Sequence, residues 1–239
     1  MNISRHTQFL KELDTVHIED DFVEGVVTGD RWSTLVADTT PTVTTPDAVN
    51  GVARLFTDTT DNNEVAIRST IELFKIGTNR EIYGRGRIQY AENDTNKANV
   101  FFGFANAIGA NLLLDNGAGM KTTGDVLAIY KLDGGTVWRL HSKVNGTTAS
   151  DTVTNKTAGG SSAQVLEVIA KDFDGVTMEV LFKIDGEYLK DSNGDQIKPH
   201  KVPIASATEM HFGVYAKTGG GSGGETVDVD YLYASQNRI

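Results

Sequence analysis

The chain contains no cysteine, which excludes disulfides, zinc–thiolate sites and a cysteine nucleophile. It has only four prolines against 25 glycines, a balance typical of a turn-rich β protein whose strands are rarely interrupted. Clustered cations are also missing, because 22 lysines and arginines are scattered among 32 acidic residues, for a formal charge of -10. Nucleic acid and anionic membranes are recognised by clustered cations, so the sequence argues against both as partners.

Two targeting features are missing as well. The longest apolar-rich stretch, residues 100 to 114, is broken by glycine and asparagine and is too short to span a bilayer. The first 21 residues show neither an apolar core region nor a small-residue cleavage site. We therefore expect a protein made in the cytoplasm without a signal peptide.

The chain is rich in the alternation of a half-buried β-strand. Residues 176 to 184 place apolar side chains on one face and mostly polar ones on the other. Asp185-Gly186 follows, a pair suited to a tight hairpin turn with positive φ. Residues 166 to 170, with Leu166, Val168 and Ala170 on one face, are expected to pair with this strand.

Residues 82 to 90 alternate in the same way, with Gly84 and Gly86 on the apolar face. Two glycines inside a strand predict the close approach of a large side chain from an opposite sheet. About a dozen or more such strands, with turn residues between them and no 40-residue repeat, predict one antiparallel two-sheet jelly-roll β-sandwich over residues 19 to 239.

An N-terminal arm, residues 1 to 18, precedes this sandwich. Residues 4 to 16 carry apolar side chains at helical spacing, which predicts a short helix. The helix either packs on its own sandwich or reaches a neighbouring subunit. In the second case Phe9, Leu10 and Leu13 are the expected partner contacts.

The most tempting catalytic pair is Asp228 and Asp230, which point the same way from one strand, roughly 7 Å apart. That separation suits an acid and a base flanking a water in an inverting glycosidase. Sandwich glucanases carry a Glu-x-Asp-x-x-Glu strand motif, however, and this segment lacks it. We expect both carboxylates on the solvent face, no catalytic residue and no enzyme. The residues expected to face inward here are Val227, Val229, Tyr231 and Tyr233.

Metal and cofactor sites have equally little support. Asp191, Asn193 and Asp195 resemble half of a calcium loop, but Gln196 stands where the glycine is required and Val202 where the bidentate glutamate is required. A simple hairpin turn is the prediction there. The histidines lie on separate segments, so we expect surface or edge residues, no metal site and no cofactor. They are His6, His17, His141, His200 and His211.

A lectin-like role would need an aromatic platform with polar neighbours. Tyr83, Tyr215 and Trp138 are the candidate stacking residues for a glycan.

A resemblance to virion structural proteins of tailed bacteriophages rests on four segments: IELFKI (71–76), the stretch that begins IYGRGRIQY (82–119), LDGGTVWRLHSKV (132–144) and SATEMHFGVYAK through VDVDYLYASQ (206–236). It covers most of residues 20 to 236. Its motifs are core strands and turns.

The resemblance implies a concanavalin A-like jelly roll and a non-enzymatic capsid decoration or cement protein on the virion surface. It implies the major capsid protein as partner and a homo-oligomer, with a trimer favoured, and it carries over no catalytic residue. Two alternatives stay open. One is a virion adhesin that binds a host-surface glycan, and the other is a sandwich-type glycoside hydrolase.

Overall fold

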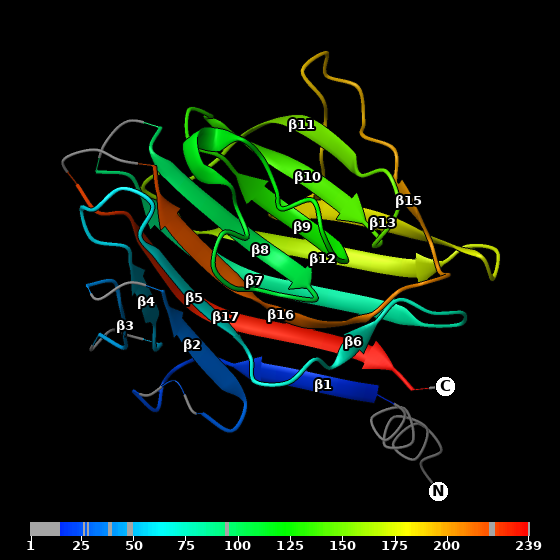
Figure 1. The fold of residues 1–239 in the computed structure, drawn as a ribbon, viewed down its shortest axis with the longest axis horizontal. Coiled ribbons are helices and arrows are strands. Elements are labelled where there is room, and N and C mark those ends of the chain that lie inside the picture. Colours follow the sequence, from blue (N-terminus) through cyan, green and yellow to red (C-terminus); the bar gives the residue numbers. More distant parts are fainter. Residues whose placement is uncertain are drawn as a thin grey trace, which may run out of the picture.

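A computed structural model describes residues 15–25, 27, 29–37, 40–46, 50–93, 96–219 and 223–238. In these residues the chain forms two antiparallel sheets, with one 3-10 turn (Asp115–Gly117) and no α-helix (Figure 1). No helix in this described part of the chain is long and apolar enough to cross a membrane. The predicted all-β two-sheet sandwich is therefore confirmed.

Sheet A has nine strands in the described residues, in the order β14-β13-β12-β7-β17-β4-β3, with β1 also pairing β17 and β15 also pairing β13. Its strands are β1 (Thr15–Asp20), β3 (Thr42–Thr44), β4 (Ala53–Phe56), β7 (Glu81–Ala91), β12 (Gln164–Asp172), β13 (Thr177–Ile184), β14 (Glu187–Tyr188), β15 (His200–Pro203) and β17 (Thr226–Asn237).

Sheet B has eight strands in the described residues, in the order β11-β10-β9-β8-β16-β5-β2, with β6 also pairing β16. Its strands are β2 (Trp32–Val36), β5 (Glu64–Ser69), β6 (Phe74–Lys75), β8 (Ala98–Ala105), β9 (Val126–Lys131), β10 (Val137–Lys143), β11 (Ser150–Thr157) and β16 (Glu209–Thr218).

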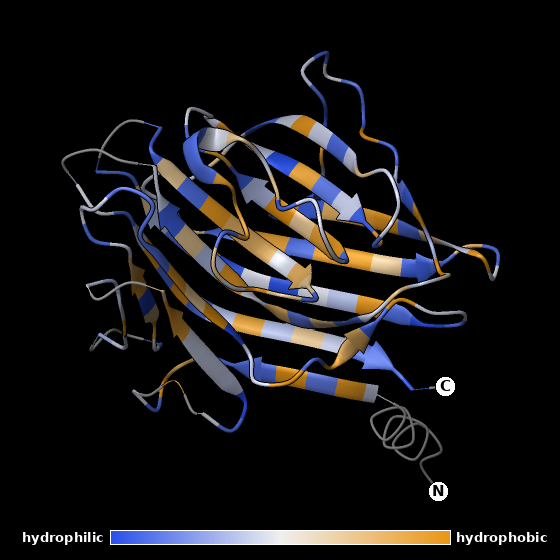
Figure 2. Ribbon diagram, viewed as in Figure 1, coloured by the Kyte–Doolittle hydropathy of each residue, from blue (hydrophilic) through white to orange (hydrophobic). Residues whose placement is uncertain are grey.

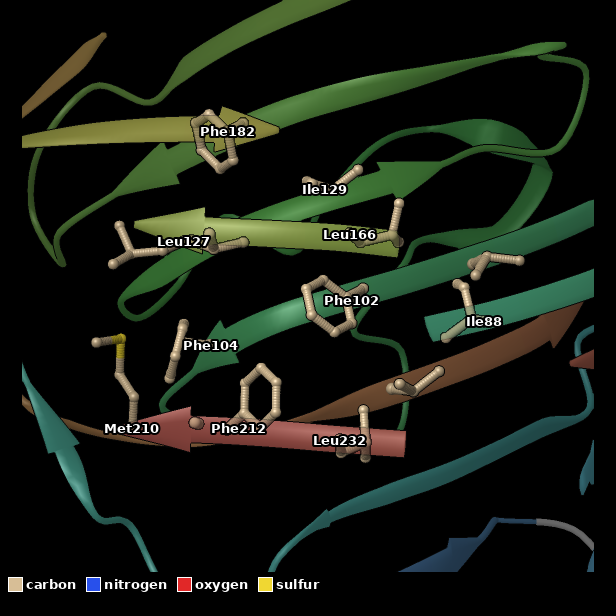
Figure 3. Close-up of a cluster of buried hydrophobic side chains, with 14 of the residues drawn as sticks. Ile88, Phe102, Phe104, Leu127, Ile129, Leu166, Phe182, Met210, Phe212 and Leu232 are labelled. Carbon is tan, nitrogen blue, oxygen red and sulfur yellow. The ribbon is translucent and has the colours of Figure 1, made fainter. Parts of the chain in front are cut away.

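Apolar and polar residues alternate along many strands (Figure 2). The main hydrophobic core lies between the two sheets, where the apolar side chains of both sheets meet. Phe102, Phe104 and Phe212 of sheet B meet Leu166 and Leu232 of sheet A in its centre (Figure 3). All of these side chains are essentially excluded from solvent. The predicted pairing of β12 with β13 is confirmed. The predicted turn at Asp185-Gly186, which joins β13 to β14, is confirmed as well, since both residues have positive φ, 55° and 80°.

The two glycines of β7 lie where aromatic rings cross from sheet B. A Cβ on Gly84 would meet Phe104 and Phe212 at 2.7 Å, and a Cβ on Gly86 would meet Phe102 at 2.6 Å. Real Cβ atoms do not approach so closely, so any larger residue must displace these rings. The prediction of a close approach from the opposite sheet is confirmed.

The outer face of sheet B is covered by residues 106 to 125, a segment we call the strap. Ile108, Leu112 and Met120 of the strap pack on Phe101 and other outward side chains of sheet B, forming a second apolar cluster. This is why all of β8 is buried on both faces. Continuous apolar strands of this kind are typical of a sheet covered on both sides.

The strap is held by charge as well as by apolar contact. The Lys217 ammonium, fully buried, lies 3.1 Å from a Glu64 carboxylate oxygen and also pairs with Asp115. The Asn111 backbone N–H donates to Glu64 at 2.9 Å, and Lys217 donates to the Leu113 carbonyl at 3.2 Å. Sheet A carries no comparable cover in the described residues, so its outer face is the more open one.

The N-terminal segment joins the sandwich earlier than the sequence predicts. Thr15 to Ile18 belong to β1 and pair with the end of β17, with Thr15 opposite Asn237. Thr15 and Val16 are thus strand rather than helix. The rest of the predicted helix, with Phe9, Leu10 and Leu13, lies outside the described residues.

Candidate functional site

The candidate site begins with a β-bulge in β17. Val229 lies opposite Ile88 of β7, but Tyr231 lies opposite Arg87, so Asp230 is an extra residue in β17. An extra residue reverses the inward and outward alternation beyond it. The sequence prediction that Tyr231 and Tyr233 face inward is therefore wrong. Both are partly exposed on the outer face, while Leu232 points into the core.

The bulge creates a tyrosine-rich surface on sheet A. The rings of Tyr83 and Tyr233 lie with centroids 6.0 Å apart, and the Arg85 guanidinium lies 5.8 Å from the centroid of the Tyr231 ring. The Tyr83 hydroxyl donates to Glu167 at 2.5 Å. Partial burial, and next the bond to Glu167, raise the pKa of Tyr83, so its hydroxyl stays protonated. We call Tyr83, Tyr231, Tyr233 and Arg85 the tyrosine site.

A pocket of about 650 Å³ adjoins the tyrosine site. Its lining residues come from β17, from β1, which lies beside β17 in sheet A, and from the segment that follows β1. Five carboxylates and one arginine line it beside two tyrosines, so the pocket offers aromatic rings together with many hydrogen-bonding groups. The lining residues are Glu19, Asp20, Asp21, Val23, Glu24, Asp30, Arg31, Tyr231, Leu232 and Tyr233.

The two carboxylates singled out in the sequence lie beside this surface and face solvent, as predicted. Asp228 makes a bidentate pair with Arg54, with N–O distances of 2.7 and 2.8 Å, and Asp230 pairs with Arg87. Hydrogen bonding to Asp228 raises the pKa of Arg54. Each carboxylate is thus neutralised by its own arginine.

Two of the three predicted stacking residues are buried, Trp138 in the core between the sheets and Tyr215 under the strap. Trp138 and Tyr215 are both 0% exposed, and the Trp138 indole N–H donates to Gln164 at 3.0 Å. Neither can stack on a ligand from solvent, so this part of the prediction is wrong. Tyr83 alone of the three is surface-accessible, and its neighbours Tyr231 and Tyr233 were missed because the bulge leaves no mark in the alternation of the sequence.

The histidine prediction is also wrong in part, since His141, His200 and His211 are buried rather than at the surface. His200 lies 3.0 Å from the Thr152 hydroxyl and 3.1 Å from that of Ser142. Burial lowers its pKa to about 4.

His141 lies 3.1 Å from Asp151 on the strap side of sheet B, so the fold brings a histidine and a carboxylate together there. Hydrogen bonds from His141, Tyr130 and Arg139 outweigh burial and lower the pKa of Asp151 to about 2. Among the described residues, no group of three or more His, Asp or Glu side chains is arranged to hold a metal ion.

The predicted turn at residues 191 to 195 is confirmed. The Asp191 side chain accepts the backbone N–H groups of Asn193 at 2.8 Å and Asp195 at 3.1 Å. Its own backbone N–H donates to the Asp195 carbonyl at 2.9 Å. The carboxylate thus closes the turn itself.

Comparison with known proteins identifies the fold. No family model and no curated protein matches the sequence. Solved structures do match in shape. An Emp47p carbohydrate recognition domain aligns with a TM-score of 0.57 at 12% identity, over 93% of this chain and 95% of that domain. A Lotus tetragonolobus seed lectin aligns with a TM-score of 0.54 at 13% identity, over 93% and 98%.

An enzyme shares the same architecture. The endo-1,3-beta-glucanase from Streptomyces sioyaensis aligns with a TM-score of 0.55 at 13% identity, over 95% of this chain and 98% of that chain. The protein is therefore a concanavalin A-like β-sandwich, a fold that lectins and a glucanase both use. At these identities the likeness defines the fold alone.

Proposed function

We propose that this protein binds carbohydrate through the tyrosine site and the adjoining pocket, and that it does not cleave its ligand. The observation that carries the proposal is the bulge at Asp230, which turns Tyr231 and Tyr233 outward beside Tyr83. A pyranose ring has an apolar C–H face and a rim of hydroxyls. Tyrosine rings can cover the first, while the carboxylates and Arg31 around the pocket can bond the second.

The non-catalytic part of the proposal rests on the ion pairs. A hydrolase of this kind needs one carboxylic acid and one carboxylate free to act on the glycosidic bond. Asp228 and Asp230, the pair suggested by the sequence, are instead engaged by Arg54 and Arg87. We expect no release of reducing sugar from β-glucans, and no effect of Asp228→Asn on that result.

The binding proposal is tested with soluble oligosaccharides from a glycan-array hit, titrated by NMR so that affinity is measured one site at a time. Tyr231→Ala and Tyr233→Ala should each weaken binding about tenfold or more. Tyr188→Ala is the matched control, since Tyr188 is 48% exposed on the same sheet but lies outside the pocket lining. Equal loss in all three variants, or no saturable binding to any glycan, would refute the proposal.

We also propose that the protein is a component of a tailed-phage virion, carried on the capsid surface. The resemblance of residues 82–119 and 206–236 to virion structural proteins supports this, and a glycan-binding site would suit a virion adhesin. β1 lies beside β17 in sheet A, so residues 1 to 14 precede the sandwich and can be removed without touching a described strand.

The truncation lacking residues 1 to 14 tests the capsid role. It should keep the melting temperature of the full chain and lose binding to purified capsids, with Phe9, Leu10 and Leu13 as the proposed contacts. Full capsid binding by this truncation would assign the contact to the sandwich instead.

A further inference from the structure

One half of the outer face of sheet A differs from an ordinary solvent face. We call the outer surface of β12 and β13, with the adjoining residues of β7, β14 and β15, the hairpin face. Phe173 and Tyr188, 54% and 48% exposed, are the two exposed aromatic residues in the described part of the chain, and both lie here. Between them Ile169 and Leu181 sit directly opposite each other and are partly exposed.

A row of alternating charge crosses this face. Glu81, Lys171, Glu179 and Lys201 follow one another across β7, β12, β13 and β15. The Lys171 ammonium lies 3.2 Å from Glu81, and that of Lys201 lies 3.7 Å from Glu179. All four are at the surface, where such pairs add little to the stability of one chain.

We propose that the hairpin face binds a second copy of this chain, with the twofold axis parallel to the strands and midway between β12 and β13. That axis exchanges the two strands. Lys171 then faces Glu179 of the second copy, and Glu81 faces Lys201 of the second copy. The row is therefore complementary to itself, which an isologous interface requires and a contact with an unrelated partner does not.

The neighbouring cross-strand residue pairs of β12 and β13 are also complementary about the same axis. Ile169 would meet Leu181 of the second copy, so the apolar pair is covered by itself. Glu167 would meet Lys183 of the second copy, since these two also lie opposite each other on β12 and β13. Phe173 lies in the turn between β12 and β13, close to the axis. The Lys201 ammonium lies 3.8 Å from the centroid of its ring.

The extent of the sheet limits the overlap. Sheet A ends at β14 and β15 on this side, so the second copy covers about four strands, β7 to β15, and leaves β17 free. Four strands at ~4.8 Å spacing and seven residues at ~3.3 Å give a footprint of roughly 400 Å² per copy. This is a small interface, so we expect micromolar self-association. The pocket beside β17 stays open in the dimer, whereas Tyr83 and Arg85 of the tyrosine site, which lie on β7, fall within the footprint.

Sedimentation velocity from about 1 to 200 µM tests the proposal with a charge-reversal pair. Lys171→Glu places two acidic residues at the central contact, and Glu179→Lys places two basic ones there. Each variant alone should self-associate at least tenfold more weakly than the parent chain. An equimolar mixture should recover dimers, because every central contact between unlike copies joins opposite charges.

Both variants should keep the parent melting temperature within a few degrees. Should either fail to fold, Glu81→Lys and Lys201→Glu form a second pair with the same logic. Recovery on mixing supports the interface, because a merely intrachain role for these charges predicts none. The proposal is overturned by a parent chain that stays monomeric at 200 µM, by a trimer, by dimers that ignore the variants, or by a mixture that stays monomeric.

Discussion

The substitution Gly86→Ala tests how closely the two sheets pack against each other. Gly86 has no strained φ, so alanine can adopt its backbone conformation. The added methyl would stand 2.6 Å from a ring carbon of Phe102 and 2.9 Å from a methyl of Leu232. Ordinary contact begins near 3.4 Å, so the Phe102 ring, which is 0% exposed, must move by about 0.8 Å within a filled core.

Overpacking of this kind costs about 1–3 kcal/mol. The smaller backbone entropy of alanine in the unfolded chain offsets up to ~1 kcal/mol of that. We expect a net loss of about 1–2 kcal/mol in the free energy of unfolding. In a chain of this size that lowers the melting temperature by roughly 2–8 °C. Urea unfolding followed by tryptophan fluorescence measures the free energy directly, since Trp32 and Trp138 are both buried.

Gly109→Ala is the matched control, because nothing lies within 4 Å of a Cβ placed there. It should change stability by less than ~0.5 kcal/mol. Phe102→Leu combined with Gly86→Ala should be more stable than the sum of the single changes predicts, by about 1 kcal/mol or more. A coupling energy within ~0.5 kcal/mol of zero would refute the steric explanation.

Two further predictions concern buried ionisable residues. Burial lowers the His200 pKa from 6.5 to about 4, so between these pH values the unfolded chain binds a proton that the folded chain does not, and stability falls as pH falls. Between pH 7 and pH 4.5 the free energy of unfolding of His200→Gln, measured with urea, should fall by about 2 kcal/mol less than that of the parent chain. The same pH dependence in both proteins would contradict this. Lys217→Met leaves the Glu64 carboxylate buried without its cation, which should cost about 3 kcal/mol and speed hydrogen exchange at the Asn111 amide. Adding Glu64→Gln should recover part of that loss, and exchange at Asn111 as slow as in the parent would show that the strap is held by its apolar contacts.

Part of the site could be read from the sequence and part could not. Tyr83 belongs to a regular stretch of β7, so its outward direction follows from simple alternation. Tyr231 and Tyr233 follow a bulge, and beyond a bulge the same alternation predicts the wrong face. Tyr215 points outward from sheet B as a regular strand requires, but the strap covers it. Which outer face of a sandwich is covered depends on contacts distant in sequence.

The sequence by itself determined most of the strands, the Asp185-Gly186 turn and the need for glycine in β7, because each depends on backbone preference and alternation within a few residues. Only the tertiary structure decided where the tyrosine site lies. β17 pairs with β4 before the bulge and with β1 after it, while β7 continues along its other side. Asp230 is the extra residue at that change of neighbour, and the pairing of three distant strands, rather than the local sequence, turns the two tyrosines outward.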